Sequence, residues 1–200
     1  MRVIILAGGY TKSEYFRDIR APKCLLPIKD DRTILDLQMN KLSKYNFPIT
    51  IVTGYDSDEV EEFCKSRGYN VTFVHDINWR SSYSLVRLVN ELKYIFEGEL
   101  ILLFSDVLFN DDLLSYLVNS SKDICKCRNT FKFSSGGIKA MVEVLSENPD
   151  LEGLNTPMLN LIREKYPKLV IESNNAPIWQ FDVDRLEDYN IIKMGDLKEG

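Results

Sequence analysis

The sequence lacks several features that mark common protein classes. It has no excess of basic residues, since 25 Lys and Arg stand against 30 Asp and Glu for a formal net charge of −5. Nucleic-acid-binding domains are generally basic, so this balance argues against a nucleic-acid partner and leaves room only for a small local phosphate site. No apolar run approaches the length of a membrane span, and no small-residue cleavage site follows the apolar stretch at the N-terminus. We therefore expect a protein of the cytoplasm with no membrane partner.

Residues for metal binding and nucleophilic catalysis are also scarce. The chain has one histidine, His75, and four cysteines. Cys125 and Cys127 form a C-x-C pair, but no second pair stands at the spacing of a zinc site, so a structural zinc ion is not expected. We expect the cysteines to be free, buried thiols.

Internal repeats and low-complexity linkers are missing as well. The 200 residues are 44% hydrophobic and 28% charged, which is the composition of an ordinary globular domain. This length is enough to bury one substantial core, so disorder is excluded and we expect a single domain over residues 1–200.

Short apolar runs alternate with amphipathic segments in the first half of the chain. Expected strands are 3–6, 49–53, 71–74 and 100–104, and expected helices are 34–45, 58–67 and 81–96. This alternation predicts parallel βαβ units, and hence a three-layer α/β/α domain with a mostly parallel twisted sheet and a site at the carboxyl ends of the strands. In the less regular second half we expect helices 111–118 and 156–166, a turn at 134–137 and short strands at 170–171 and 179–183.

Two short stretches suit phosphate binding. In Leu6-Ala7-Gly8-Gly9, small residues after the first strand let the backbone approach a ligand and offer N–H groups to an anion. A tight turn after the strand explains the glycine pair equally well. The dinucleotide-binding fingerprint G-x-G-x-x-G is missing. In the stretch PKCLLP at 22–27, prolines fix where the ammonium of Lys23 points, although a lone lysine is more often simply solvated.

Together these stretches resemble the nucleoside-triphosphate transferases, the family of sugar-phosphate and choline-phosphate nucleotidyltransferases. Members open with a strand, L-A-A-G-x-G-x-R and then P-K-x-L-L-P; here LAGG begins at Leu6 and PKCLLP begins at Pro22, at the usual spacing. The segments 31–35 and 51–55 also match, and the resemblance covers nearly the whole chain. It implies the Rossmann-like nucleotide-diphospho-sugar transferase fold, with a nucleotide-binding half at 1–110 and an acceptor-binding half at 111–200.

Three aspartates are the candidate metal ligands. Asp106 ends the apolar strand 100–104, where the family usually has Gly-Asp and the Asp binds Mg²⁺. The segment 179–188 resembles the family's closing W-x-E-I-D-T-x-E-D, with Asp182 in the Glu place and Asp184 in the place of the second metal ligand. Period two puts both carboxylates on one strand face, which therefore cannot be a dry core. A turn cap at Asp106 and an acid-capped edge strand are the alternatives.

The segment after the third strand is the candidate for recognising the base. Asn78, Ser82 and Ser84 resemble the N…S-x-S-L stretch by which cytidylyltransferase-like members approach base and ribose, which favours CTP. A plain helix N-cap by Ser81 or Ser82 explains one of these serines equally well. The resemblance thus implies nucleotide contacts at nine positions: Leu6, Ala7, Gly8, Gly9, Lys23, Asn78, Ser82, Ser84 and Asp106.

One family arginine is missing, because Ser13 stands in its place. A cation is needed there, since charge builds up on the leaving pyrophosphate. Arg17 and Arg20 lie in the same loop and are our candidates for this catalytic role beside Lys23. The substitution also suits a non-catalytic nucleotide-binding protein.

The acceptor pocket falls in the second half. Lys132, Lys139 and Trp179 are the candidates, although each lysine is more often merely a surface cation. The resemblance implies Mg²⁺-dependent transfer of NMP, with CMP favoured, from an NTP to a small phosphorylated acceptor such as a sugar phosphate or phosphocholine, with release of pyrophosphate. A glycosyltransferase of similar fold is the alternative enzyme, but it usually needs an Asp-x-Asp pair and Ser105-Asp106-Val107 has one acid. The acceptor's identity and the oligomeric state stay open.

Overall fold

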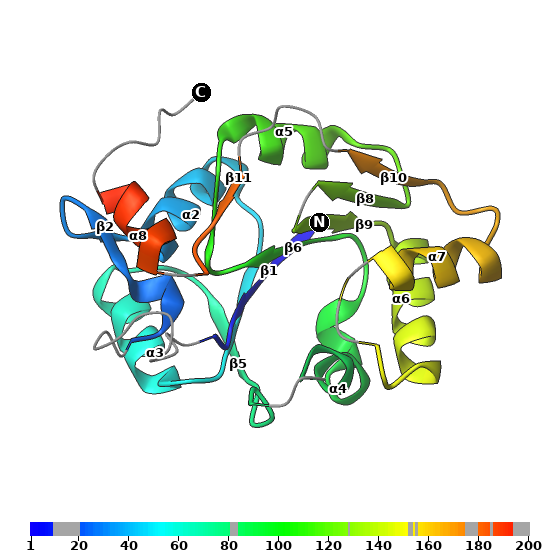
Figure 1. Ribbon diagram of the computed structural model, residues 1–200, viewed down its shortest axis with the longest axis horizontal. Coiled ribbons are helices and arrows are strands. Elements are labelled where there is room, and N and C mark those ends of the chain that lie inside the picture. The colour runs from blue at the N-terminus through cyan, green and yellow to red at the C-terminus, as the bar shows by residue number, and fades with distance from the viewer. Residues whose placement is uncertain are drawn as a thin grey trace.

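The computed structural model describes residues 1–9, 21–80, 84–127, 129–151, 154, 156–174, 180–184 and 186–193. A seven-stranded sheet lies at the centre, in the order β10-β8-β9-β6-β1-β4-β5 (Figure 1). Its strands are β1 (Arg2–Ala7), β4 (Ile49–Thr53), β5 (Thr72–His75), β6 (Leu100–Phe104), β8 (Ile124–Cys127), β9 (Thr130–Phe133) and β10 (Ile171–Asn174). Within this sheet β9 alone runs antiparallel to its neighbours, so the prediction of a mostly parallel sheet is confirmed.

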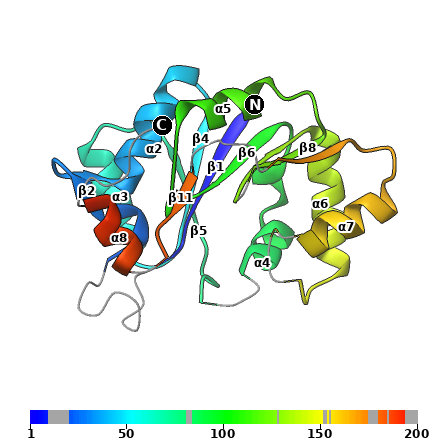
Figure 2. The ribbon, with the colours of Figure 1, turned by 45° about the horizontal axis from the view of Figure 1, so that its top comes forward.

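Helices cover both faces of the sheet, as expected for three layers (Figures 1 and 2). One face carries α2 (Ile34–Leu42), α3 (Ser57–Ser66) and α5 (Asp111–Asn119). The other carries α4 (Ser84–Glu91), α6 (Ser135–Glu147) and α7 (Thr156–Lys165). None of the described helices is long and apolar enough to cross a lipid bilayer.

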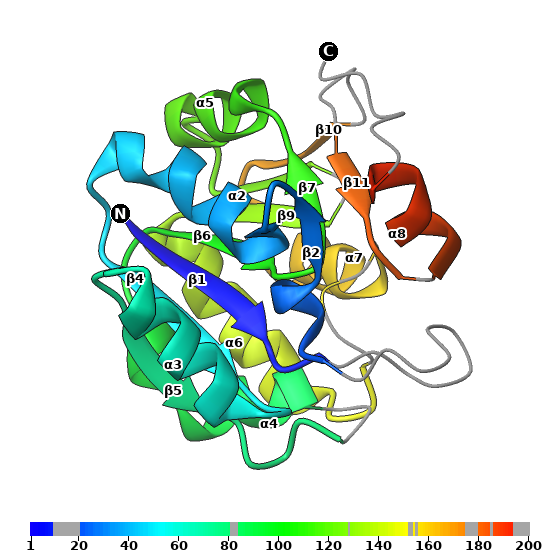
Figure 3. The same cartoon turned by 90° about the vertical axis from the view of Figure 1, so that its left-hand side faces the viewer.

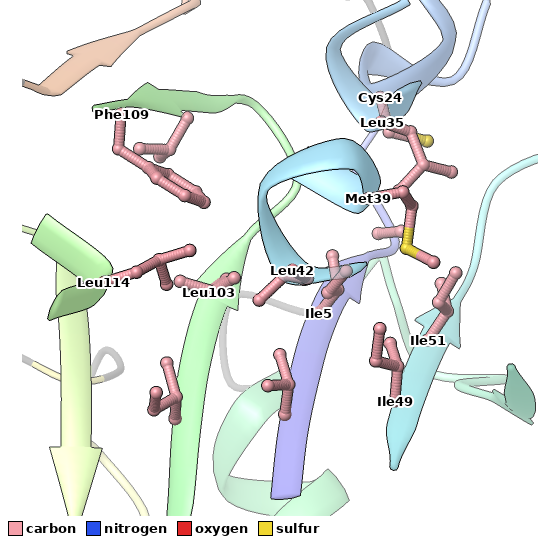
Figure 4. Close-up of a cluster of buried hydrophobic side chains, with 14 of the residues drawn as sticks. Ile5, Cys24, Leu35, Met39, Leu42, Ile49, Ile51, Leu103, Phe109 and Leu114 are labelled. Carbon is pink, nitrogen blue, oxygen red and sulfur yellow. The ribbon is translucent and has the colours of Figure 1, made fainter. Parts of the chain in front are cut away.

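Alternation along the central strands builds two separate cores. In β1, Val3 and Ile5 pack on the α2 side while Ile4 packs on the α6 side. Figure 4 shows the first of these cores, where strand side chains meet one face of α2; its labelled members are Ile5, Cys24, Leu35, Met39, Leu42, Ile49, Ile51, Leu103, Phe109 and Leu114. Because both sheet faces are covered, the central strands β1, β4 and β6 are mostly apolar, as their sequences predict.

Two of the expected helices and one expected turn differ clearly in the structure. The helix expected over 81–96 is split into α4 and a 3-10 turn, η3 (Lys93–Phe96), and residues 81–83 lie outside the described part. The helix expected over 34–45 ends as α2 at Leu42 and continues as the 3-10 turn η2 (Ser43–Tyr45). The turn expected at 134–137 is wrong: Ser134 accepts a hydrogen bond from the amide of Gly137 and caps α6. A Cβ at Gly137 would lie 2.3 Å from the carbonyl oxygen of Asp123, so the glycine allows this helix to approach β8 closely.

A third, smaller core joins a segment of the first half of the chain, residues 26–34, to a segment near the C-terminus, residues 181–189. The hairpin of β2 (Pro27–Lys29) and β3 (Arg32–Thr33) lies beside α8 (Leu186–Lys193), and β7 (Val107–Phe109) pairs antiparallel with β11 (Gln180–Asp182) (Figure 3). The buried residues of this third core are Leu26, Ile28, Ile34, Leu108, Val183 and Tyr189. The Tyr189 hydroxyl donates a hydrogen bond to the carbonyl of Pro27, 2.6 Å away, which anchors α8 to the hairpin.

The four cysteines meet the expectation for them. Cys24, Cys64, Cys125 and Cys127 are all free and buried. Burial raises the pKa of Cys64 to about 11, with the nearby carboxylates of Asp36 and Glu61 adding to the shift. A thiol with so high a pKa is a poor nucleophile at neutral pH, which agrees with a packing role.

Candidate functional site

Lys23 lies at the carboxyl edge of the sheet, where the end of β1 meets the chain that returns to it. It opens the 3-10 turn η1 (Lys23–Leu25), which Pro22 precedes. Its amide donates to the carbonyl of Gly9, 3.3 Å away. Its Cδ lies 3.8 Å from the point that a Cβ on Gly9 would occupy, so the lysine side chain passes directly over the glycine. Two distant motifs of the sequence are thereby in contact.

The ammonium of Lys23 joins two carboxylates from separate parts of the chain. Its Nζ lies 3.0 Å from Oδ2 of Asp106, which follows β6, and 3.0 Å from Oδ1 of Asp184, which follows β11. The side chains of Lys23 and Asp106 are 15% and 23% exposed, whereas that of Asp184 is 67% exposed. Burial opposes the charge on Lys23, but the carboxylates of Asp106 and Asp184 outweigh it and raise its pKa above the ordinary value. The site therefore holds two negative groups that converge on one positive group.

Backbone hydrogen bonds hold the turn that carries Asp106. The amide of Ser105 donates to the carbonyl of Leu6 in β1, at 3.1 Å. The carbonyl of Asp106 accepts from the amide of Val183, at 2.8 Å. Because Val183 is buried in the small third core, the packing of α8 and β11 also sets where Asp184 lies.

Asp182 takes a different partner from Asp184. It pairs with Val107 in the β7–β11 ladder, and its carboxylate accepts a hydrogen bond from the side-chain amide of Asn129, between β8 and β9. The structure thus brings Asp106 and Asp184 together on Lys23 and places Asp182 at the neighbouring hairpin. Among the described residues, no three His, Cys, Asp or Glu side chains are grouped to hold a metal ion by themselves.

Beside this cluster, Gly8 and Gly54 pack tightly against each other and against Trp79. A Cβ on Gly54, after β4, would lie 2.6 Å from Cβ of Trp79 and 2.8 Å from Cα of Gly8. The Trp79 ring meets Tyr55 edge-on with ring centroids 5.5 Å apart. Asn78, half-buried, donates its backbone amide to Asp76 in the same loop. Trp79 could not be singled out from the sequence, because its role depends on contacts with Gly8 and Gly54 at the ends of two strands.

Several predicted residues cannot be placed in this way. Arg17, Arg20, Ser82 and Trp179 lie outside the described residues. Ser84 is described through its backbone, as the first residue of α4. Of the small residues after β1, Ala7 is fully buried and Leu6 packs against the α6-side core, which leaves Gly8 and Gly9 as the accessible ones.

The two lysines predicted for the acceptor do not reach this edge. Lys132 is 3% exposed, and its ammonium donates to the carbonyl of Ser120 and lies 3.7 Å from Glu99. Glu99 precedes β6 and Asp106 follows it, so the Lys132 ammonium lies at the opposite, amino end of that strand. Lys139 is exposed in the second turn of α6, which also starts at the amino end because Phe133 pairs with Leu100. The antiparallel direction of β9, which the sequence pattern did not reveal, causes both misplacements.

Lys126 is a further cation, which was not among the acceptor-binding residues predicted from the sequence. It lies on β8, which runs parallel to β6 because β9 is antiparallel to both, and it is the last residue but one of β8, level with Leu102 in β6. It is partly exposed, and its Nζ lies 5.6 Å from the ring centroid of Phe131. In the described part of the chain no carboxylate lies within ion-pair distance of it.

The fold and this edge define a Rossmann-like nucleotidyltransferase. The family of the MobA-like NTP transferase domain matches residues 3–133, and the chain belongs to this family. It is therefore an enzyme that transfers a nucleoside monophosphate from a nucleoside triphosphate. A search of curated protein sequences found no match.

Solved structures of nucleotidyltransferases share the fold over the whole chain at low identity. CTP:phosphocholine cytidylyltransferase from Streptococcus pneumoniae is 14% identical, with 98% of this chain and 99% of that chain covered and a TM-score of 0.67. The inositol-1-phosphate CTP transferase from T. maritima is 13% identical, with 98% and 96% covered and a TM-score of 0.67. A nucleotidyl transferase from Methanothermobacter thermautotroptrophicus is 17% identical, with 97% and 96% covered and a TM-score of 0.67.

Proposed function

We propose that this nucleotidyltransferase uses Mg²⁺ to transfer CMP from CTP to a small phosphorylated acceptor and releases pyrophosphate. The observation that carries the proposal is the convergence of Lys23, Asp106 and Asp184 beside Gly8 and Gly9. The preference for CTP rests on the Asn78-to-Ser84 stretch and is supported by two neighbours of the same fold whose names include CTP. A sugar phosphate or a phosphocholine-like molecule is the acceptor class.

The donor set at this edge fits a magnesium ion. Asp106 and Asp184 each place a carboxylate oxygen 3.0 Å from one cationic atom, so both already face a single point of positive charge. Mg²⁺ prefers hard oxygen ligands and commonly binds through one or two carboxylates, with substrate phosphates and water filling its other positions. Two protein carboxylates are therefore enough, and Asp106 and Asp184 would hold the ion. When bound there, it would neutralise charge on the triphosphate and orient the α-phosphate.

The chain's own residues would do the rest by positioning and charge neutralisation. An oxygen of the acceptor phosphate attacks the α-phosphorus in line, and the bond from that phosphorus to the bridging oxygen breaks as pyrophosphate leaves. No protein nucleophile is needed, which agrees with the poor nucleophilicity of the buried thiols. Gly8 and Gly9 would offer backbone amides to the phosphates, and Lys23 would turn from the carboxylates towards them. Arg17 and Arg20 would meet the charge on the leaving pyrophosphate.

The acceptor phosphate needs its own cation at the same edge. Lys126 meets that need better than Lys132, because it lies near the carboxyl end of β8 and has no carboxylate partner among the described residues. Trp179 precedes β11 in the sequence and stays our candidate for packing against the rest of the acceptor. Lys126 replaces Lys132 and Lys139 in this proposal.

A pyrophosphate-release assay with each of the four nucleoside triphosphates and a panel of sugar phosphates and phosphocholine tests the proposal. We expect turnover that needs both a triphosphate and a phosphorylated acceptor, and that is fastest with CTP. Asp106→Asn and Asp184→Asn should lower it by orders of magnitude without unfolding the chain, whereas Glu62→Gln, an exposed carboxylate on α3, should not. Nucleotide binding without turnover would favour the non-catalytic alternative, and hydrolysis or transfer from a nucleotide sugar would favour the glycosyltransferase.

A further inference from the structure

Gln38 is a buried polar residue on the apolar face of α2. It is 1% exposed and lies among Leu35, Met39 and Leu42, which all belong to the core under the sheet. Packing alone would favour an aliphatic side chain at this position, because a buried amide must find hydrogen-bond partners to avoid a penalty. A polar residue here therefore calls for a specific account.

The side-chain amide of Gln38 spans the turn that carries Asp106. Its Nε2 donates to the carbonyl of Phe104 at 2.9 Å and to the carbonyl of Val107 at 2.7 Å. Phe104 ends β6 and Val107 begins β7, so the two carbonyls flank the two-residue connection. Both N–H bonds of one amide are thus used to close a single tight turn.

The oxygen of the same amide, Oε1, does not account for a glutamine at this position, which leaves the two hydrogen bonds donated by Nε2. Within the described structure, Oε1 of Gln38 is buried with no hydrogen-bond partner. An unpaired buried carbonyl destabilises a fold, so the residue is not explained by its acceptor. Removing Nε2 instead would leave the Phe104 and Val107 carbonyls without this donor in a buried place.

We infer that Gln38 is a positioning residue that holds Asp106 where it meets Lys23 and Asp184. The inference rests on the proposed function, because it assigns Gln38 a part in that reaction. Backbone hydrogen bonds to Leu6 and Val183 also hold the turn, and Lys23 holds the Asp106 carboxylate itself. Gln38 adds two side-chain hydrogen bonds to the backbone of the turn, which it reaches from α2. Small displacements of a reacting group lower rates steeply, so losing this tie should slow turnover without removing any group that contacts substrate.

Gln38→Met tests the inference, since it keeps the length of the side chain and removes both donors. Amide hydrogen exchange should become faster at Asp106, Val107 and Val183, while the β1–β4 ladder keeps its protection. The kcat for pyrophosphate release should fall at least roughly tenfold, with little change in the KM for CTP. If Gln38→Met fails to fold, Gln38→Asn keeps an amide one methylene too short to reach both carbonyls and serves the same test.

Met39→Ala is the matched control, because it damages the same helix without touching the turn. It should lower the melting temperature at least as much as Gln38→Met and leave kcat unchanged well below that temperature. Unchanged exchange at the turn in Gln38→Met, or faster exchange with an unchanged kcat, would overturn the inference. If the parent protein shows no turnover with any triphosphate, the proposed function fails by itself, and the part assigned to Gln38 in the reaction is overturned with it, even where exchange shows that Gln38 holds the turn.

Discussion

Replacing Lys23 by methionine should increase the affinity of the site for a free divalent cation, although it should weaken the binding of nucleotide. The ammonium lies 3.0 Å from Asp106 and 3.0 Å from Asp184, so a metal ion that uses these carboxylates must displace it or share them with it. Methionine keeps an unbranched side chain of similar length and removes the charge. The variant therefore isolates the competition between Lys23 and the metal.

The size of the effect follows from the exposure of the two pairs. Two unit charges 4 Å apart interact by about 1 kcal/mol in water and by about 4 kcal/mol at an effective dielectric constant of 20. Asp184 is 67% exposed, so its pair belongs near the lower limit, whereas Asp106 is 23% exposed and lies between the two. We expect Lys23→Met to bind free Mn²⁺ at least roughly tenfold more tightly than the parent, which is about 1.4 kcal/mol.

Mn²⁺ titration followed by electron paramagnetic resonance measures this affinity without any turnover. The same samples should show a smaller rise in melting temperature with CTP in Lys23→Met than in the parent, because a phosphate contact is lost. Lys65→Met, which removes an exposed lysine on α3, is the control and should change neither value. Equal Mn²⁺ affinity in Lys23→Met and the parent would show that the ammonium does not compete with the metal, and the reasoning from the ion pair would be wrong.

Three further outcomes are expected. Lys126→Ala should raise the KM for the phosphorylated acceptor several-fold and leave that for CTP unchanged, with Lys139→Ala as the control; equal effects of the two would remove Lys126 from the acceptor site. Gly54→Ala should destabilise the chain by about 1–3 kcal/mol, since its Cβ would overlap Trp79 and Gly8. Calorimetry should show a fall in melting temperature of about 2–4 °C for each kcal/mol. The double variant Arg17→Ala/Arg20→Ala should slow pyrophosphate release at least roughly tenfold, about 1.4 kcal/mol of barrier, and full activity in a rate assay would assign the cation elsewhere.

The parallel half of the fold could be predicted because its signals are local. Each apolar run ends in a glycine or a polar residue, and each amphipathic segment that follows has room for one helix. Thr33 caps α2 in a capping box with Asp36, and such a pattern lies within four consecutive residues. Family motifs then indicated Lys23, Asp106 and Asp184, and the structure places all three in contact.

The β8–β9 hairpin escaped prediction because its strands do not alternate between apolar and polar residues. In β9 all four residues are buried, including Thr130 and Lys132. A lysine fits there only because its ammonium reaches the carbonyl of Ser120 and the carboxylate of Glu99. Neither partner can be recognised before the fold is known, so a buried structural lysine looked like a free cation available to an acceptor.

Sequence motifs predict the residues of the site but not the contacts between them. Motifs identify residue types, but they do not say that the Lys23 ammonium touches carboxylates 83 and 161 positions away, or that one amide closes the Asp106 turn. Gln38 matches no phosphate or metal motif, and its hydrogen bonds join it to carbonyls 66 and 69 positions further along. A polar residue on the apolar face of a helix is visible in the sequence, but its partners are fixed by how α2 packs against the ends of β6 and β7. For that reason, a residue such as Gln38, which holds a ligand-binding group in place without touching the ligand, is found from the structure. Residues that belong to a ligand-binding motif, such as Lys23 and Asp106, can be found from the sequence.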